Sequence, residues 1–464
     1  MTAAEYTPAS AAEPVGVAAA LAGHARRDPD RTAVTAGARR WSFAEWDEVV
    51  SRSASTLRAA GVGPGERVAV ALGDPADQLR WALAADRLDG CPAVLDPRWP
   101  AARSRAALDS LHAAAAVGAT GVVARPGAAG SGGAGWIAYT SGSSGTPRAV
   151  ARTRGSWTAS FAAFTELTGL GRRDRVLVPG GLSSSMCAFA ALHALHRGAA
   201  LDLLSGWDPV LVPAACTVAH LVPTMLRDLV IARSPLRARL LISAGAALDP
   251  ELERAARAVW PGTRVLEYYG SSEQSFVSVR TGSPGSVGTA FPGVQIQIRA
   301  TARSVLPPGR PGLIWTRSPF SAQGYLDDAG GRFRRCGDWV SVGDRGTLDS
   351  TGTLRLLGRD YVVTGGTTVD PAAVEGELRT VAGVQEAVVF GLPHPRLGEV
   401  VVAVLTGQLP PLRVLRAHAR DRLAPAERPR RWFALPTMPV TTGGKPARAE
   451  LLAAAREGRL RPVR

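Results

Sequence analysis

The chain has 464 residues, 46% of them hydrophobic, and this exceeds what one hydrophobic core usually supports, so we expect at least two folded domains. Its net charge of +15 comes from arginines spread along the chain without a basic run or interleaved aromatic residues, which argues against nucleic-acid binding. No apolar run is long enough to cross a bilayer and the four cysteines form no CxxC pair, so we expect a cytoplasmic protein without a disulfide framework or a thiolate metal site.

From Val15 to about Pro126, the pattern alternates amphipathic helices with short apolar strands. Residues 41–61, WSFAEWDEVVSRSASTLRAAG, have the periodicity of an amphipathic helix that ends at its last glycine, and RVAVAL reads as a buried strand. A helix-to-strand turn explains the Gly-rich GVGPGE between them. This alternation predicts βαβ units with a parallel sheet. Residues 121–135 predict a strand end that runs into a loop or linker.

The stretch Tyr139–Val150, YTSGSSGTPRAV, is rich in small hydroxyl and glycine residues. Gly142 and Gly145 let the backbone turn, so that consecutive N–H groups and five Ser or Thr hydroxyls can face one anionic ligand. The apolar segments on both sides predict two strands joined by this loop. Because no Ser or Thr follows the basic residue Arg148, the stretch is not a Walker A loop. It predicts a phosphate-binding hairpin tip; the alternative is a flexible surface loop.

Further helices and strands alternate from Trp157 onward. A helix over Trp157–Thr168 precedes the strand of RVLVPG, and GLSSSMCAFAALHALHRGAAL predicts a loop that feeds a helix. On the sequence alone, Ser183–Met186 is the N-cap region of that helix. His193 and His196 have i, i+3 spacing on it but no third ligand nearby, so they indicate ordinary helix surface rather than a metal site.

The strand VLEYYG, followed by SSEQSF, carries an aromatic pair next to a glycine and the carboxylate of Glu273. Tyr268 and Tyr269 would suit a purine face, and Glu273 would suit a metal or phosphate contact. The alternative is a strand end with a solvated glutamate. An apolar strand in LLISAGAAL precedes this segment.

The pattern of predicted elements changes after residue 280. Residues 281–357 contain short strands with Gly and Pro turns, which predict antiparallel β structure. From residue 361, YVVTGGTTVDPAAVEGELRTVAGVQEAVVFG predicts strand, Gly turn, helix and strand, which indicates a small α+β domain. The single lysine of the chain, Lys445, follows a turn rich in Thr and Gly. Its compact ammonium is a point charge that a planar guanidinium does not replace.

Together these segments resemble the adenylate-forming superfamily, which includes acyl-CoA synthetases, adenylation domains of nonribosomal peptide synthetases and luciferases. The hairpin resembles its phosphate-binding signature, EYYGSSE its Tyr-Gly-x-Thr-Glu motif, Gly343-Asp344 its Thr-Gly-Asp motif, and GGK its C-terminal Gly-Lys motif. The resemblance covers nearly the whole chain. It implies an α/β fold with a large N-terminal domain (1–358), made of two stacked αβαβα subdomains and a small β-barrel, and a small mobile C-terminal α+β domain (359–464).

The resemblance also implies roles for individual residues, with ATP, Mg²⁺ and coenzyme A as cofactors. Glu273 and Lys445 are the catalytic candidates: Glu273 helps hold Mg²⁺, and Lys445 reaches the carboxylate and α-phosphate oxygens. Contacts to ATP or AMP are implied for Thr140, Ser141, Gly142, Ser143, Ser144, Gly145, Thr146, Arg148, Gly245, Ala246, Tyr269, Ser272, Asp344 and Arg359. The substrate pocket would use Ser183, Ser184, Ser185, Met186 and Gly270. Gly365 and Gly366 would line the thiol tunnel, and Asp360 would be the hinge.

Among these roles, Tyr269 stacks on adenine, Ser272 replaces the usual Thr at the α-phosphate, and Asp344 accepts hydrogen bonds from both ribose hydroxyls. Asp338 lies in the same Gly-Asp dipeptide, but the residues after Asp344 keep the family's spacing to Arg359.

The chain also departs from the family pattern. Arg148 stands where the family usually has Lys. Two fewer residues separate Arg359 from Gly365 than in typical relatives, and Thr368 stands where Asn is common. Around residues 179–185 there is neither the His of many relatives nor the Asp of amino-acid-activating members, which disfavours an α-amino acid substrate.

The chemistry implied by the resemblance needs no protein nucleophile, because the substrate carboxylate itself attacks the α-phosphorus and the protein supplies position and positive charge. We expect an acid–CoA ligase that forms an acyl adenylate, releases pyrophosphate and transfers the acyl group to coenzyme A. A separate carrier protein or an amine as acceptor is the alternative. An adenylate-using oxygenase and a silent nucleotide-binding relative are further alternatives, the last disfavoured because both Lys445 and Glu273 are present.

Overall fold

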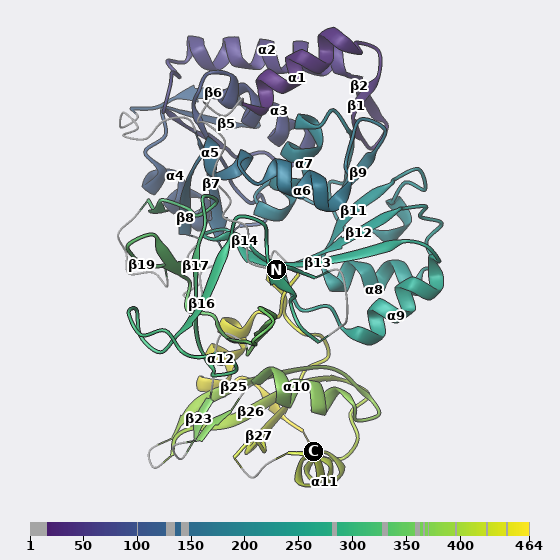
Figure 1. Ribbon diagram of the computed structural model, residues 1–464, viewed down its shortest axis with the longest axis vertical. Coiled ribbons are helices and arrows are strands. Elements are labelled where there is room, and N and C mark those ends of the chain that lie inside the picture. The colour runs from purple at the N-terminus through teal and green to yellow at the C-terminus, as the bar shows by residue number, and fades with distance from the viewer. Residues whose placement is uncertain are drawn as a thin grey trace.

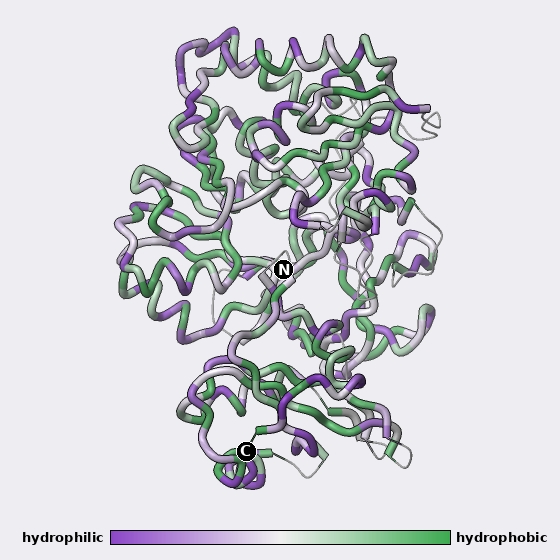
Figure 2. Tube along the Cα trace, turned by 180° about the vertical axis from the view of Figure 1, so that it is seen from behind, coloured by the Kyte–Doolittle hydropathy of each residue, from purple (hydrophilic) through white to green (hydrophobic). Residues whose placement is uncertain are grey.

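The structure is a computed structural model that describes residues 16–99, 101–126, 135–140, 148–280, 285–326, 333–357, 362–364, 367–369, 371–394, 397–423, 426–441 and 444–463. These residues form four β-sheets with helices packed on them (Figure 1). Figure 2 shows hydrophobic residues concentrated along the central strands, with hydrophilic residues more frequent on the outer helices. Within the described ranges, no helix combines the length and hydropathy needed to span a bilayer.

The first sheet has seven strands and a mainly parallel centre. Across the sheet they are β18 (Gly324–Tyr325), β8 (Arg148–Thr153), β7 (Gly135–Thr140), β4 (Cys91–Val94), β3 (Arg67–Val70), β5 (Ala115–Gly118) and β6 (Gly121–Ala124). The helices between its strands are α3 (Pro75–Arg87) and α4 (Ala101–Leu111). The parallel pairing of β3 with β4 and β5 confirms the predicted βαβ units. Antiparallel pairing of β7 with β8 confirms that the loop after Thr140 joins two arms of a hairpin.

The second sheet has nine strands, of which six neighbours from β13 to β1 run parallel. Across the sheet they are β15 (Thr289–Ala290), β14 (Ser275–Arg280), β13 (Arg264–Ser271), β12 (Leu240–Ser243), β11 (Val218–Leu221), β9 (Arg175–Val178), β10 (Ala200–Leu203), β1 (Thr32–Ala36) and β2 (Arg39–Ser42). The other helices of this part are α1 (Val17–Arg27), α2 (Phe43–Ala59), α5 (Arg154–Thr158), α6 (Phe161–Thr168), α7 (Ser185–His196), η1 (Pro209–Leu211), α8 (Pro223–Ile231) and α9 (Pro250–Val259).

Two predicted helices have different bounds. The helix predicted over residues 41–61 begins only at Phe43, because Ser42 caps it: the Ser42 side chain accepts from Glu45 N, and the Glu45 carboxylate accepts from Ser42 N. The helix predicted over Trp157–Thr168 is two helices, α5 and α6. Thr153 caps α5 through Ser156 N, so this short helix starts before the predicted range.

The prediction that His193 lies on ordinary helix surface is wrong. Helix α7 is apolar on every side, so it is buried within the largest hydrophobic cluster, which joins the first two sheets. His193 is fully buried; its ring stacks on Phe189, and its Nε2 lies 2.9 Å from Thr165 Oγ1. His196 is partly buried, and burial lowers its pKa to about 4.

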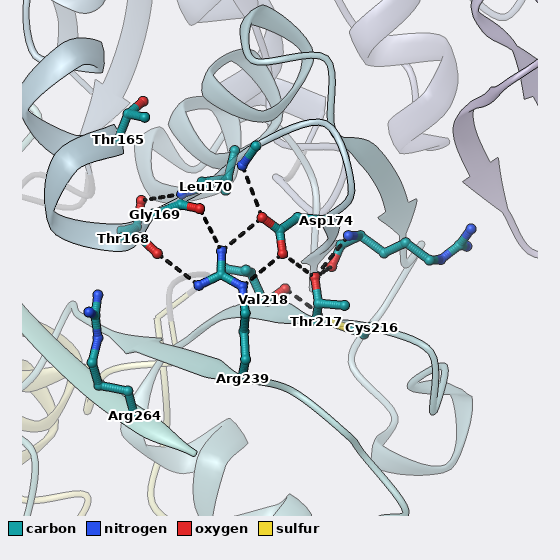
Figure 3. Close-up of polar contacts among 12 residues, drawn as sticks. Thr165, Thr168, Gly169, Leu170, Asp174, Cys216, Thr217, Val218, Arg239 and Arg264 are labelled. Carbon is teal, nitrogen blue, oxygen red and sulfur yellow. Dashed lines mark hydrogen bonds and ion pairs between the residues drawn. The ribbon is translucent and has the colours of Figure 1, made fainter. Parts of the chain in front are cut away.

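A polar network joins the amino ends of three neighbouring strands (Figure 3). Asp174, Thr217 and Arg239 directly precede β9, β11 and β12. The Asp174 carboxylate accepts hydrogen bonds from Arg239 Nε at 2.9 Å and from Thr217 Oγ1 at 2.7 Å. Although burial opposes it, these hydrogen bonds hold the pKa of Asp174 below its usual range. The network stabilises the amino edge of the sheet and leaves the carboxyl edge for other contacts.

The third sheet is antiparallel, as predicted for residues 281–357. Its strands are β19 (Arg334–Cys336), β20 (Trp339–Ser341), β17 (Gly312–Arg317), β21 (Arg345–Leu348) and β22 (Leu354–Leu356), with β16 (Gln295–Arg299) paired to β17. This six-stranded sheet stands where the small barrel was expected.

The fourth sheet lies at the lower end of the molecule in Figure 1. Its strands are β24 (Thr367–Val369), β23 (Val362–Thr364), β26 (Gly398–Gly407), β27 (Arg431–Ala434) and β28 (Arg461–Pro462), with β25 (Val384–His394) paired to β26. Helices α10 (Pro371–Arg379) and α11 (Leu412–Arg422) contribute to one hydrophobic cluster, and α12 (Arg448–Arg456) contributes to another. The predicted strand, helix and strand are present as β23, α10 and β25, with the further strand β24 before the helix, whereas the predicted Gly turn at 365–366 lies outside the described residues.

Candidate active site

The predicted site residues of the second sheet gather at its carboxyl edge, opposite the Asp174 network. Gly245 follows β12, and Ser272 and Glu273 follow β13; Val222, which was not among the predicted residues, follows β11 at the same edge. Loops at the carboxyl ends of neighbouring parallel strands meet at one edge, which is where ligands bind in open α/β sheets. The topology therefore brings together residues that lie far apart in the sequence.

Tyr269 and Asp344, predicted for adenine and ribose, are in direct contact. The Tyr269 hydroxyl donates a hydrogen bond to Asp344 Oδ2 at 2.5 Å, and Asp344 is buried. Asp338, the alternative in the other Gly-Asp dipeptide, is exposed in the turn between β19 and β20. Of the two aspartates, the structure brings Asp344 to the predicted nucleotide residues.

Glu273 is buried rather than a solvated strand end. It is 8% exposed, and its Oε1 accepts a hydrogen bond from the Tyr325 hydroxyl at 2.9 Å. The Tyr325 ring also contacts the Arg148 guanidinium, whose Cζ lies 5.3 Å from the ring centroid. Sequence reasoning missed Tyr325, because a Gly-Tyr pair before two aspartates has no distinctive local pattern and its contacts are long-range.

The predicted substrate residues lie at the start of α7. Ser184 is its N-cap residue by backbone conformation, but its side chain makes no capping hydrogen bond. Ser185 instead brings its Oγ to 2.9 Å from Ser272 Oγ, which joins a predicted pocket residue to the predicted α-phosphate contact. At Gly270, near the end of β13, a Cβ would lie 2.0 Å from Ser275 O of the paired strand β14, so only glycine fits at this position.

Lys445 reaches the same edge from the fourth-sheet part of the chain. Thr441 N donates to Lys445 O at 2.6 Å, and Val440 bridges Pro446, so the lysine lies at the end of a tight turn. The Lys445 Cε lies 3.7 Å from the position that a Cβ on Gly245 would occupy. In the same turn, a Cβ on Gly444 would lie 3.5 Å from both Val222 and Thr224 side-chain atoms. The turn therefore packs directly on the loops after β11 and β12.

Several predicted residues lie outside the described ranges: Ser141–Thr146 of the hairpin tip, Arg359, Asp360, Gly365 and Gly366. Thr140 ends β7, and only its backbone is described. Ala246 is exposed beside Gly245, whereas Ser183 and Met186 are partly buried near the start of α7.

The fold and the site define an open-sheet α/β protein in which Tyr269, Asp344, Glu273 and the lysine of the fourth-sheet part gather near one sheet edge. The family model for AMP-binding enzymes matches residues 21–131 and 134–326, and the model for the AMP-binding enzyme C-terminal domain matches residues 373–445. The chain therefore belongs to the AMP-binding enzyme family, the acyl-CoA synthetase type of the adenylate-forming superfamily.

Individual relatives agree with this assignment. The uncharacterised acyl-CoA ligase YhfT of Bacillus subtilis is 30% identical over 92% of this chain and 96% of its own length. Feruloyl-CoA synthase of an Amycolatopsis species is 28% identical, with the same coverage of both chains. ATP-bound MatB of Rhodopseudomonas palustris has a similar structure, with TM-score 0.84, 23% identity and coverage of 96% and 99%. Amide bond synthetase McbA of Marinactinospora thermotolerans matches with TM-score 0.79, 26% identity and coverage of 94% and 99%. The expected fold class is confirmed.

Proposed function

We propose that this protein is an AMP-forming acid–CoA ligase whose substrate is an aliphatic or aryl acid without an α-amino group. The relatives named acyl-CoA ligase and feruloyl-CoA synthase support the activity. The position of Lys445 beside Gly245 is the observation that carries the proposal, because it puts the chain's single lysine at the edge where Tyr269, Ser272 and Glu273 also lie. The lack of an acidic residue near Ser183 supports an acid without an ammonium group.

In the first step, a carboxylate oxygen of the acid bonds to the α-phosphorus of ATP, and the bond to the bridging oxygen breaks as pyrophosphate leaves. The protein contributes position and charge. The Lys445 ammonium faces the carboxylate and α-phosphate oxygens, where negative charge must be brought together. Tyr269 holds the adenine, and Asp344 holds the ribose, since a carboxylate offers about four lone-pair directions for its hydroxyls.

Glu273 suits a magnesium ion. Mg²⁺ prefers hard oxygen ligands and usually takes one or two carboxylates together with substrate phosphates. The Glu273 carboxylate is held by Tyr325 at one oxygen. In the described part of the chain, no group of three His, Cys, Asp or Glu side chains could hold a metal unaided, so the ATP phosphates would complete the ligand set. A bound ion would offset the negative charge of the phosphates that the hairpin tip and Arg148 hold.

In the second step, the thiol of coenzyme A gives up its proton to solvent, its sulfur bonds to the acyl carbon of the adenylate, and the bond from that carbon to the phosphate oxygen breaks as AMP leaves. Lys445 must withdraw for the thiol to approach, which a rotation of residues 359–464 about Asp360 would achieve while bringing Gly365 and Gly366 to the site. An amine acceptor is the second candidate, favoured by the 26% identity to a protein named amide bond synthetase. A separate carrier protein is the other acceptor that this chemistry admits.

The test is a panel of carboxylic acids offered with ATP and Mg²⁺, scored by pyrophosphate release. Acids that give release are then supplied with coenzyme A, carrier proteins and amines, and the products are identified by mass spectrometry. The expected result is acid-dependent pyrophosphate release followed by an acyl-CoA thioester. Release that no acid stimulates, or an amide as the sole product, would contradict the proposal.

A further inference from the structure

Tyr325 connects two groups that the activation of ATP uses. Its hydroxyl donates to Glu273 Oε1 at 2.9 Å, and its ring carries the Arg148 guanidinium at 5.3 Å from the centroid. Glu273 follows β13 of the nine-stranded sheet, whereas Arg148 begins β8 of the seven-stranded sheet. One side chain therefore bridges the acidic and the basic residue of the site across two sheets.

The backbone around Tyr325 is fixed to both sheets. Residues 320–326, which we name the strap, include β18, and β18 pairs antiparallel with β8 so that Tyr325 lies opposite Val150. Two residues before β18, Ala322 N donates a hydrogen bond to Glu273 O at 2.7 Å. The strap thus touches the phosphate hairpin on one side and the Glu273 turn on the other, and it cannot shift without breaking backbone hydrogen bonds.

A buried arginine anchors the start of the strap. Arg152 of β8 is 4% exposed, and its Nη2 donates to Phe320 O at 2.9 Å and to Ser156 O at 2.6 Å. Its guanidinium lies 4.3 Å from the Trp157 ring centroid. Burial lowers the pKa of Arg152 to about 9, and the charge of Glu273 opposes this shift. A buried cation with backbone acceptors and a nearby carboxylate holds the strap beside Glu273.

We propose that Tyr325 is a positioning residue for Glu273, fixing one carboxylate oxygen so that the other is presented to the metal ion, while its ring supports Arg148 at the phosphates. Among the described residues, no other side chain hydrogen-bonds the Glu273 carboxylate. This inference rests on the proposed function, in which Glu273 holds Mg²⁺. Hydrogen bonds between polar groups and charged partners are strong enough to orient a carboxylate.

The phenol remains a proton donor at neutral pH. Burial, and then the negative charge of Glu273, raise the pKa of Tyr325 above its usual range, although Arg148 opposes the shift.

The test is Tyr325→Phe, which keeps the ring over Arg148 and removes only the hydroxyl. Binding of Mn²⁺ to the enzyme in complex with a non-hydrolysable ATP analogue is followed by electron paramagnetic resonance, and we expect affinity to fall roughly tenfold, the effect of a hydrogen bond to a charged group. The Mg²⁺ concentration for half-maximal pyrophosphate exchange should rise by a similar factor, while KM for the acid stays unchanged. Tyr325→His, which keeps a ring and an N–H donor, should retain part of the affinity.

Thr263→Val is the matched control, because it removes a hydroxyl that donates to Ala238 O at 2.7 Å at the opposite end of β13. It should leave Mn²⁺ affinity as in the wild type. In a Glu273→Gln background, Tyr325→Phe should cause no further loss of metal affinity. The inference would be overturned if Tyr325→Phe, measured below its Tm, bound Mn²⁺ with wild-type affinity. It would also be overturned if Tyr325→Phe lowered Mn²⁺ affinity by the same factor in the wild-type and in the Glu273→Gln background. Because metal binding is read directly, this result does not depend on finding the acid substrate.

Discussion

The side chain of Lys445 passes over Gly245, with its Cε 3.7 Å from the place where a Cβ on that glycine would lie. Gly245 has φ of +88°, a conformation that residues with a Cβ rarely adopt, and it lies two residues after β12, which ends at Ser243. The glycine thus leaves room for a lysine that arrives from another part of the fold. In the proposed function, the adenylate-forming step needs the Lys445 ammonium at the nucleotide, and this arrangement suits that step.

Replacing Lys445 with Ala should affect the two half-reactions unequally. In the proposed function the ammonium stabilises charge brought together at the α-phosphate, so its loss should slow acid-dependent pyrophosphate release by about a hundredfold or more, as for other single preorganised donors. Thioester formation from supplied acyl adenylate should largely survive, because Lys445 has no part in that step. Both rates are measured on the same preparation. An equal loss in both half-reactions would show that Lys445 does not have the assigned role.

Gly245→Ala should slow the first step while leaving the fold intact. The added Cβ would lie 3.3 Å from Val222 Cγ1 and 3.7 Å from Lys445 Cε, and the positive φ adds strain of roughly 1–2 kcal/mol to the folded state. We expect a small fall in Tm. We also expect roughly a tenfold fall in the rate of pyrophosphate release, because a displaced Lys445 ammonium would lose the geometry that the reaction needs. Gly262→Ala is the control: it also has positive φ, at +86°, but no neighbouring atom within 4 Å of the added Cβ. It should lower Tm without a matching loss of rate.

Asp344→Asn should weaken ATP binding. In the proposed function Asp344 holds the ribose, and the substitution removes the charge that strengthens those hydrogen bonds, so KM for ATP should rise by about tenfold or more. Asp338→Asn is a matched control, because Asp338 has the same preceding glycine but is exposed in a turn. Its KM for ATP should stay within about twofold of the wild type. A similar effect of both substitutions would remove Asp344 from the nucleotide site.

The buried histidines should make the protein less stable in mild acid. Burial is the main cause that lowers the pKa of both His193 and His220 to about 3, and neither ring nitrogen of His220 has a hydrogen-bond partner in the described structure. Between about pH 6.5 and 3 the unfolded chain binds protons at these positions that the folded chain does not. The free energy of unfolding is therefore highest above pH 6.5 and should fall as the pH drops, by up to about 1.4 kcal/mol per pH unit for each histidine.

Urea unfolding at pH 5.0, 5.5, 6.0 and 7.0 would measure this slope, in a range where most carboxylates stay ionised. His220→Leu should make the slope shallower by about one proton. His112→Asn serves as control, because His112 is exposed and its φ of +46° is one that Asn tolerates. A slope that His220→Leu leaves unchanged would mean that His220 does not remain neutral in the folded protein.

Elements with local signals could be predicted from residue patterns alone. The two arms of the hairpin around residues 141–147, the parallel centre of the first sheet and the antiparallel pattern of residues 281–357 follow from hydrophobic periodicity and turn residues, which act within a few positions. The candidates Glu273 and Lys445 were also evident, since their neighbours form compact motifs and Lys445 is the single lysine.

Long-range packing determines how these elements meet. Strand pairing brings Tyr325 to Glu273, and the turn at Lys445 reaches Gly245, although no local pattern encodes either contact. Packing between the first two sheets also buries His193, because a helix that is apolar on every side becomes an interior element only when two sheets enclose it. Periodicity specifies which face of an element avoids water, whereas packing specifies which partner covers that face.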